Sequence, residues 1–220
     1  MHRLLFEKTG NAVWISHLDL MRLFQRAFRR ADLPLVHSRG FNPRPSVSIA
    51  LPLSVGVESR CELLDFELDG CQVSCAEIRE RLNQALVSGV RVLDVYEDGR
   101  KIKHLALLDC VVTLEYDAGV PEHGREILDG VFHSQSLPVE KRSKNGNIQD
   151  QDLIPMIRHL EVVQIDGNTL ELQGRVCCQN PTLNPMQLVA AIQRHCPEMT
   201  PDFAKCCRVE VYDTEEKTFR

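Results

Sequence analysis

The sequence lacks the features that mark membrane proteins, secreted proteins and several classes of enzyme. Across 220 residues, no apolar run approaches the roughly 20 residues that a membrane-spanning helix needs. The opening MHRLLFEKTG is too short and too polar for a signal peptide. Neither a glycine-rich phosphate loop, nor a nucleophile elbow, nor a metalloprotease helix motif occurs. These absences predict a cytoplasmic protein with no membrane association and no familiar catalytic motif.

A disulfide framework is also missing, although cysteine is not scarce. Nine cysteines are an odd number in a chain without a secretory signal, which argues against structural disulfides. Cys71 and Cys75 lack the third cysteine of an iron–sulfur triad. Cys177-Cys178, His195-Cys196 and Cys206-Cys207 could meet in a zinc site, but neighbours on a strand point to opposite faces. We therefore favour buried cysteines acting as small hydrophobic residues, and predict neither a metal nor a cofactor.

Charge is present but unevenly distributed along the chain. Residues 1–46 contain eight Lys/Arg against three Asp/Glu, a local excess of +5 in a chain whose net charge is −5. Residues 97–220 contain 14 basic and 20 acidic residues, a local charge of −6. A basic segment on an acidic protein is compatible with a polyanionic partner. It is equally compatible with two solvated surfaces of opposite sign.

Hydrophobic periodicity in the first half predicts the order strand, helix, strand, strand, helix, strand. The first helix begins at Ser16, because Asp19 three residues later completes a capping-box-like arrangement, and Pro34 follows its end. This order is that of a split βαβ, or ferredoxin-like, fold, which leaves one face of its sheet free of helices. The predicted segments are 3–8, 16–32, 46–53, 61–70, 74–87 and 90–99.

The second half repeats this order with additions, after a linker predicted at residues 97–103. Asn145-Gly146 predicts a hairpin turn, and the last helix has Asn184 as its cap and Pro185 at its first position. The predicted class is therefore α+β, with two tandem ferredoxin-like domains with antiparallel sheets, at 1–98 and 104–220. The segments expected in this half are 104–117, 121–132, 137–142, 162–166, 169–178, 184–195 and 206–213.

The first predicted helix carries four arginines: Arg22, Arg26, Arg29 and Arg30. Their spacing places Arg22, Arg26 and one of the last two on a common stripe. Such a stripe is typical of the solvated side of an amphipathic helix. Alternatively, cations in a row along a rigid element suit contacts to phosphates.

His17 is the one candidate for catalysis. At the first turn of the helix, the positive end of the helix dipole favours the neutral imidazole, which could act as a general base. No second acid, base or nucleophile is identifiable by its spacing from this histidine. A structural role is the alternative, so His17 is a weak catalytic candidate.

The stretch HSRGFNPRPSVSIALPL, residues 37–53, combines an aromatic residue with cations and stiffening residues. Gly40 permits positive φ, while Pro43 and Pro45 restrict the residues before them to extended shapes. The result is a stiff connector that presents Phe41, which suits stacking on a base beside phosphate contacts. The alternative is that Phe41 plugs the end of the core.

Three segments resemble a known family: ISHLDLMRLFQRAFRRADLPL, SRGFNPRPSVSIALPLSVGVES and ELLDFEL. They are similar to the bacterial radical-SAM-linked (radical-SAM-associated) family, whose shared domain of unknown function occurs alone or attached to a radical SAM protein. The resemblance is dense over residues 3–70 and thin afterwards. It implies an accessory role beside a radical SAM enzyme, with encoded neighbours that often include RNA-processing and ribosome-related proteins. Many relatives carry histidine where this chain has Arg44, which favours an anion contact over catalysis at that position.

The leading hypothesis is an accessory binding module that presents an anionic substrate, RNA rather than DNA, to a radical SAM protein. Two alternatives stay open: an RNA-processing or RNA-modifying enzyme centred on His17, and a scaffold whose free sheet faces dock the radical SAM partner. The predicted binding surface consists of His17, Arg22, Arg26, Arg30, His37, Phe41, Asn42 and Arg44.

Overall fold

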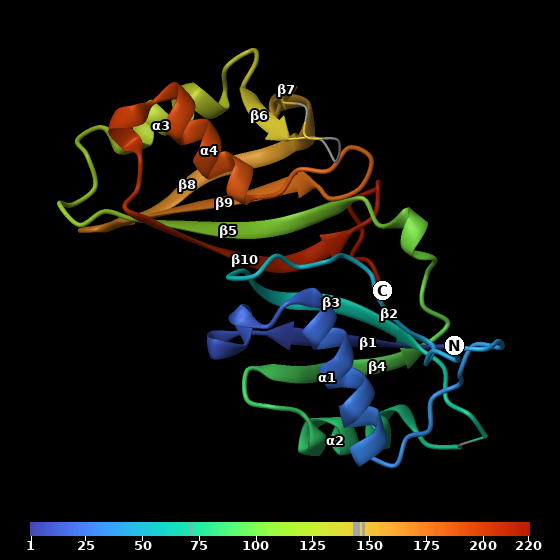
Figure 1. The fold of residues 1–220 in the computed structure, drawn as a ribbon. Coiled ribbons are helices and arrows are strands. Elements are labelled where there is room, and N and C mark those ends of the chain that lie inside the picture. The colour runs from blue at the N-terminus through green and yellow to red at the C-terminus, as the bar shows by residue number, and fades with distance from the viewer. Residues whose placement is uncertain (71, 143–145, 147) are drawn as a thin grey trace. The chain divides into compact units, whose positions relative to one another are not determined.

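The computed structural model describes residues 1–70, 72–142, 146 and 148–220. The chain divides into two compact units, residues 1–102 together with Arg220 (unit 1) and residues 103–219 (unit 2). Both units are mixed α+β with antiparallel strand pairing (Figure 1). No helix among the described residues is both long enough and apolar enough to cross a membrane.

Unit 1 has the predicted order of elements. Its strands pair in the order β4-β1-β3-β2, and each neighbouring pair is antiparallel. Both helices contribute buried side chains to one core with Leu4 and Phe6 of the central strand. The elements are β1 (His2–Lys8), α1 (His17–Arg30), β2 (Val47–Ile49), β3 (Glu58–Phe66), α2 (Cys75–Ala85) and β4 (Val90–Glu97).

Helix α1 forms where the sequence signals place it. The Ser16 hydroxyl accepts a hydrogen bond from the Asp19 N–H at 3.2 Å, so the predicted cap is confirmed. Phe24 packs edge-on against Phe6 of β1, with ring centroids 4.8 Å apart, and Phe28 lies 4.8 Å from Phe66 of β3. Each buried phenylalanine contributes about 1.5–3 kcal/mol through burial. Because this apolar face of α1 is buried, the opposite face of the helix remains in solvent.

Several predicted boundaries in unit 1 were too wide. Helix α1 ends at Arg30 rather than at Asp32, because Asp32 adopts a left-handed φ of 52° that helical geometry excludes. Of the extended segment predicted at 46–53, only Val47–Ile49 pairs as a strand. Helix α2 stops at Ala85, since Leu86 turns to extended backbone. Its Ser74 cap, which accepts from the Glu77 N–H at 3.3 Å, was not predicted.

Unit 2 follows the same path with one added hairpin. Its sheet has the order β10-β5-β9-β8, while β6 and β7 form a separate two-stranded sheet. Helices α3 and α4 lie on one face of the four-stranded sheet (Figure 1). The elements are β5 (Leu107–Glu115), α3 (Gly124–Phe132), β6 (Pro138–Arg142), β7 (Ile148–Asp152), β8 (Ile157–Asp166), β9 (Thr169–Cys177), α4 (Met186–His195) and β10 (Phe203–Tyr212).

Two helix starts in unit 2 also differ from prediction. Helix α3 begins at Gly124 rather than at Pro121, because His123 adopts a left-handed φ of 57°. Pro185 precedes the first helical residue of α4 instead of occupying it. The N-cap is therefore Pro185 rather than the predicted Asn184, whose Oδ1 still accepts from the Met186 N–H at 3.1 Å. The turn predicted at Asn145-Gly146 includes Asn145, which lies outside the described residues.

Candidate nucleic-acid interface

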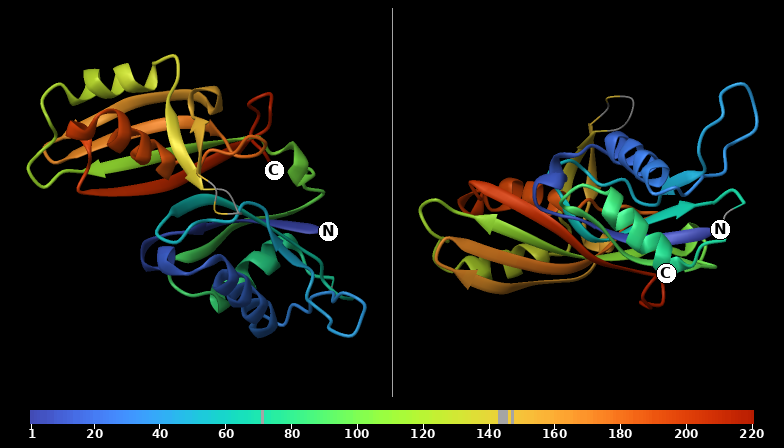
Figure 2. Two further views of the ribbon diagram at one scale, coloured as in Figure 1. Left: turned by 45° about the horizontal axis from the view of Figure 1, so that its top comes forward. Right: turned by 90° about the horizontal axis from the view of Figure 1, so that it is seen from below.

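The loop between α1 and β2 is a closed structure that projects from unit 1 (Figure 2). At its base His37 bridges Pro45, and the Ser38 N–H donates to the Arg44 carbonyl at 2.8 Å. The Ser38 hydroxyl accepts from the Arg44 N–H at 3.0 Å. These bonds hold the two arms of the loop together, so residues 37–45 (the projecting loop) form a defined element.

Phe41 stands at the tip of the projecting loop with its ring fully in solvent. The alternative that Phe41 plugs the end of the core is therefore wrong. Gly40 has a φ of 136°, which no L-side chain adopts easily, and this conformation produces the turn at the tip. Asn42 and Arg44 are exposed beside Phe41. The loop thus presents an aromatic ring, an amide and a cation without burying any of them.

The arginines of α1 have different surroundings. Arg22 lies 3.0 Å from Asp19 in an exposed ion pair that contributes little stability. Arg30 donates to the Ala85 carbonyl at the end of α2, and thus turns away from the projecting loop. Among the described residues, the side chains of Arg26 and Arg29 make no hydrogen bond or ion pair, and both are exposed. Arg29 therefore takes the place that the sequence analysis assigned to Arg30.

A pocket of about 660 Å³ lies between α1 and the projecting loop. We call it the helix–loop pocket. Its volume is within the range of small-molecule sites, roughly 300–1,000 Å³. Six apolar residues, three of them prolines, and four polar residues make up the lining. The whole lining is Gln25, Phe28, Arg29, Asp32, Leu33, Pro34, Leu35, His37, Pro43 and Pro45.

Gln25, Arg29 and Asp32 in this lining were missed as site residues. The signal that could have found them is their spacing of four and three residues, which places them on one side of the helix and its C-terminal cap. His37, which was predicted, is in the lining, and its Nδ1 donates to the Leu35 carbonyl at 2.8 Å. The ring orientation of His37 is thereby fixed.

His17 lies apart from this surface. It occupies the first position of α1, whereas the projecting loop follows the last, and a 14-residue helix is about 21 Å long. The His17 Nδ1 is enclosed and has no hydrogen-bond partner among the described residues. Asp19 is already bound by Ser16 and Arg22. Of the eight predicted side chains, His37, Phe41, Asn42 and Arg44 share the projecting loop, whereas His17 lies at the other end of α1 and Arg30 turns toward α2.

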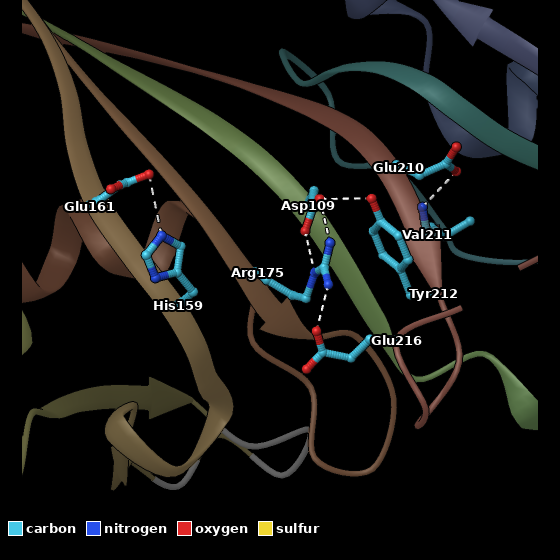
Figure 3. Close-up of polar contacts among 8 residues, drawn as sticks. All are labelled: Asp109, His159, Glu161, Arg175, Glu210, Val211, Tyr212 and Glu216. Atoms are coloured by element: carbon cyan, nitrogen blue, oxygen red, sulfur yellow. Dashed lines mark hydrogen bonds and ion pairs between the residues drawn. The ribbon is translucent and has the colours of Figure 1, made fainter. Parts of the chain in front are cut away.

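A second polar cluster lies on the sheet of unit 2 (Figure 3). Arg175 of β9 donates to both Asp109 oxygens, at 2.7 and 3.0 Å, and to Glu216 at 2.7 Å. Its guanidinium stacks 3.9 Å from the centre of the Tyr212 ring, and the Tyr212 hydroxyl donates to Asp109. The hydrogen bonds that Arg175 donates to Asp109 raise the pKa of Arg175 above its usual range. Each nitrogen of this guanidinium already has a hydrogen-bond partner within the protein. We therefore interpret the cluster as structural, holding strands together.

The cysteines are mostly interior. Six of the eight described cysteines are buried, and Cys71 is outside the described residues. Burial raises the pKa of Cys178 and of Cys206 to about 12. No group of three or more metal-ligating side chains occurs in the part of the chain that the structure describes.

The sequence matches one protein family over most of its length. The profile of that family, described as uncharacterized protein conserved in bacteria (DUF2344), matches residues 2–185. Among curated proteins, none is similar to the chain in sequence.

Several solved structures are similar at low sequence identity. A chain in the crystal structure of a Cbf5–Nop10–Gar1 complex has a TM-score of 0.52 and 10% identity, covering 96% of this chain and 48% of that chain. A chain in an archaeal box H/ACA sRNP Nop10–Cbf5 complex has a TM-score of 0.46 and 11% identity, covering 94% and 46%. This chain thus spans about half the length of each of these two solved chains. The first similarity supports the mixed α+β fold alone.

Proposed function

The chain belongs to the bacterial DUF2344 family, and we propose that it acts as an RNA-binding module. The binding surface is the exposed side of α1 together with the projecting loop. The observation that carries this proposal is the position of Phe41, fully exposed at the tip of a closed loop with cations around it. Exposure of a phenylalanine ring to water is unfavourable in hydration free energy. A ring that a stiff loop holds in solvent is therefore well suited to stacking on a binding partner.

Single-stranded RNA fits this surface better than a duplex does. Sequence-tolerant single-strand binding combines aromatic rings, on which bases stack, with cations that contact phosphates. Arg26, Arg29 and Arg44 are exposed cations on α1 and the projecting loop. In an RNA duplex the bases are already stacked on one another, which leaves Phe41 without a partner.

The proposed partner is a radical SAM protein, to which this chain presents its RNA. The support is the sequence resemblance of residues 3–70, together with exposed apolar side chains around the start of α1, at the opposite end of this helix from the projecting loop. Trp14, Leu18 and Val55 are large apolar side chains exposed by 66%, 67% and 53%. Co-purification of the two proteins tests this part of the proposal, and loss of the complex in Trp14→Ser locates it.

We also propose that each unit is a ferredoxin-like domain, with the chain divided into domains at 1–98 and 104–220. The strand orders β4-β1-β3-β2 and β10-β5-β9-β8 support this assignment. The enzyme alternative centred on His17 is less well supported, because Asp19, the carboxylate nearest in sequence, is engaged by Ser16 and Arg22.

The proposal is tested by fluorescence anisotropy with a labelled single-stranded RNA of mixed sequence. Three phosphate contacts predict a slope of log affinity against log salt of about −2. Arg26→Glu and Arg44→Glu are each expected to weaken binding about tenfold, by losing one contact and adding repulsion. Phe41→Ala is expected to cost about 1–3 kcal/mol of binding free energy through lost stacking.

The matched control is Arg79→Glu, which makes the same charge change on the exposed side of α2. It is expected to leave the affinity within about twofold of wild type, since a distant surface charge is screened. Absence of RNA binding at low salt contradicts the proposal. So does an equal loss in Arg79→Glu, because binding would then depend only on the net charge of the chain.

A further inference from the structure

The polar side chains of the helix–loop pocket are a mixed set of donors and acceptors. Arg29 supplies N–H donors, Asp32 supplies two carboxylate oxygens, and Gln25 has an amide that offers both. Among the described residues, none of these three side chains makes a hydrogen bond. His37 uses Nδ1 to bond Leu35, so its Nε2 is the ring nitrogen left for a ligand. A flat apolar ligand with polar edges matches this lining.

We propose that the helix–loop pocket binds a single unstacked guanine base of the RNA. The inference rests on the proposed RNA-binding function and specifies its base preference. Guanine presents adjacent N1–H and N2–H donors, which a carboxylate such as Asp32 accepts through its two oxygens. The same base presents O6 and N7, the acceptor pair that arginine recognises.

The other bases match this lining less completely. Adenine and cytosine each offer one amino group, and uracil offers one ring N–H, so none gives Asp32 two adjacent donors from neighbouring positions. Adenine also lacks a carbonyl oxygen beside N7 for Arg29. An unstacked base is the form in which RNA presents these edges to a protein, and the solvent-accessible prolines Pro34, Pro43 and Pro45 of the lining suit its faces.

Asp32 has a backbone conformation that makes it a suitable residue to test. Its φ of 52° lies in the left-handed region, at the position just past α1 where glycine and asparagine are usual. Asp32 also lines a neighbouring hollow with Arg30 and Arg81, so it stands between two depressions of the surface. Asp32→Asn and Asp32→Gly remove the carboxylate while keeping residues that tolerate this φ, and neither is expected to lower the thermal unfolding midpoint.

The experiment compares oligouridine RNAs that differ in one central nucleoside: guanosine, adenosine, cytidine or uridine. Anisotropy titrations of the 220-residue chain are expected to show about tenfold tighter binding of the guanosine RNA than of the adenosine RNA. Asp32→Asn is expected to bring this ratio close to one, while affinity for the adenosine RNA stays the same or rises with the loss of a negative charge. Arg26→Glu is expected to lower all four affinities and keep the ratio.

The outcomes separate this inference from the function on which it rests. Equal binding of all four RNAs overturns the guanine preference and leaves RNA binding intact. So does a preference for cytidine, or a guanosine preference that survives in both Asp32→Asn and Asp32→Gly. Absence of binding to any RNA overturns the proposed function itself.

Discussion

The two units of this protein share a framework and differ in what is built on it. In each unit the extra structure is inserted at the same topological position, between the first helix and the second strand of the sheet. Unit 1 has the projecting loop there, and unit 2 has the β6–β7 hairpin. The first helices differ in charge, since α1 carries four arginines and one aspartate, whereas α3 carries one arginine and two acidic residues. The candidate function therefore lies on the insertion and its helix rather than on the shared framework.

The frameworks themselves share a cross-strand ion pair with the charges exchanged. In unit 1, Arg3 of β1 donates to both oxygens of Asp65 in β3, at 2.5 and 3.0 Å. In unit 2, Asp109 of β5 accepts from Arg175 in β9 at the equivalent strand pair. The two carboxylates are equally exposed at 18%, but Arg3 is only 2% exposed and Arg175 is 23% exposed. The depth of the guanidinium is thus the main difference between the two pairs.

The largest predicted effect is that of Asp65→Ala. Burial lowers the pKa of Arg3, but the hydrogen bond and charge of Asp65 raise it above its usual value, so the charged form depends on this carboxylate. Removing Asp65 takes a carboxylate that accepts two hydrogen bonds away from a buried cation, whose bond to the Arg100 carbonyl stays. The expected loss is about 3–5 kcal/mol of unfolding free energy in unit 1, measured by urea titration of Trp14 fluorescence.

Asp109→Ala is expected to cost less, about 1–2 kcal/mol in unit 2. Arg175 keeps its bond to Glu216 and its stacking on Tyr212, and it is closer to solvent. Hydrogen exchange of the strand amides in both variants provides the comparison on one scale. A cost in unit 2 equal to or above that in unit 1 contradicts the explanation from guanidinium depth.

Alkaline pH is expected to destabilise mainly unit 2, and by less than the two aspartate substitutions do. Burial raises the pKa of Cys196 to about 11 and that of Cys206 to about 12, from 9.0 for a free thiol. Because the folded-state pKa of these thiols is above that of a free thiol, the stability that the neutral thiols contribute is complete below about pH 9. It is lost as the pH rises toward the folded-state pKa. The urea midpoint is therefore expected to fall between about pH 8 and pH 10.5.

Cys206→Ala is expected to reduce that fall, because it removes one of the responsible thiols. Cys75→Ala is the matched control in unit 1, since Cys75 is only partly buried. An equal fall in wild type and Cys206→Ala, in parallel urea titrations, contradicts the assignment to buried thiols.

The order of elements could be predicted because the signals for it are local. Ser16 and Asp19 define the start of α1, and the periodicity of Leu20, Phe24 and Ala27 defines its buried face. The boundaries were less predictable, since single left-handed residues such as Asp32 and His123 decide them. The exposure of Phe41 could not be predicted from the neighbouring sequence either, because it depends on the bridge between the two arms of the projecting loop.

The site could be predicted only in part, for a related reason. Arg26, His37 and Phe41 were found from residue type, but residue type does not reveal which arginine another element engages. Arg30 was chosen over Arg29 because nothing in the sequence indicates its bond to the Ala85 carbonyl. The carboxylate of Asp32 was overlooked because a pocket forms only when the helix and the projecting loop fold against each other.

Binding of RNA at the projecting loop of unit 1 can be located by ultraviolet cross-linking of a single-stranded RNA, followed by mass spectrometry of the cross-linked peptides. We expect cross-links within residues 37–45, centred on Phe41, that disappear in Phe41→Ala. Cross-links confined to unit 2, or unchanged in Phe41→Ala, would show that RNA does not bind at this loop.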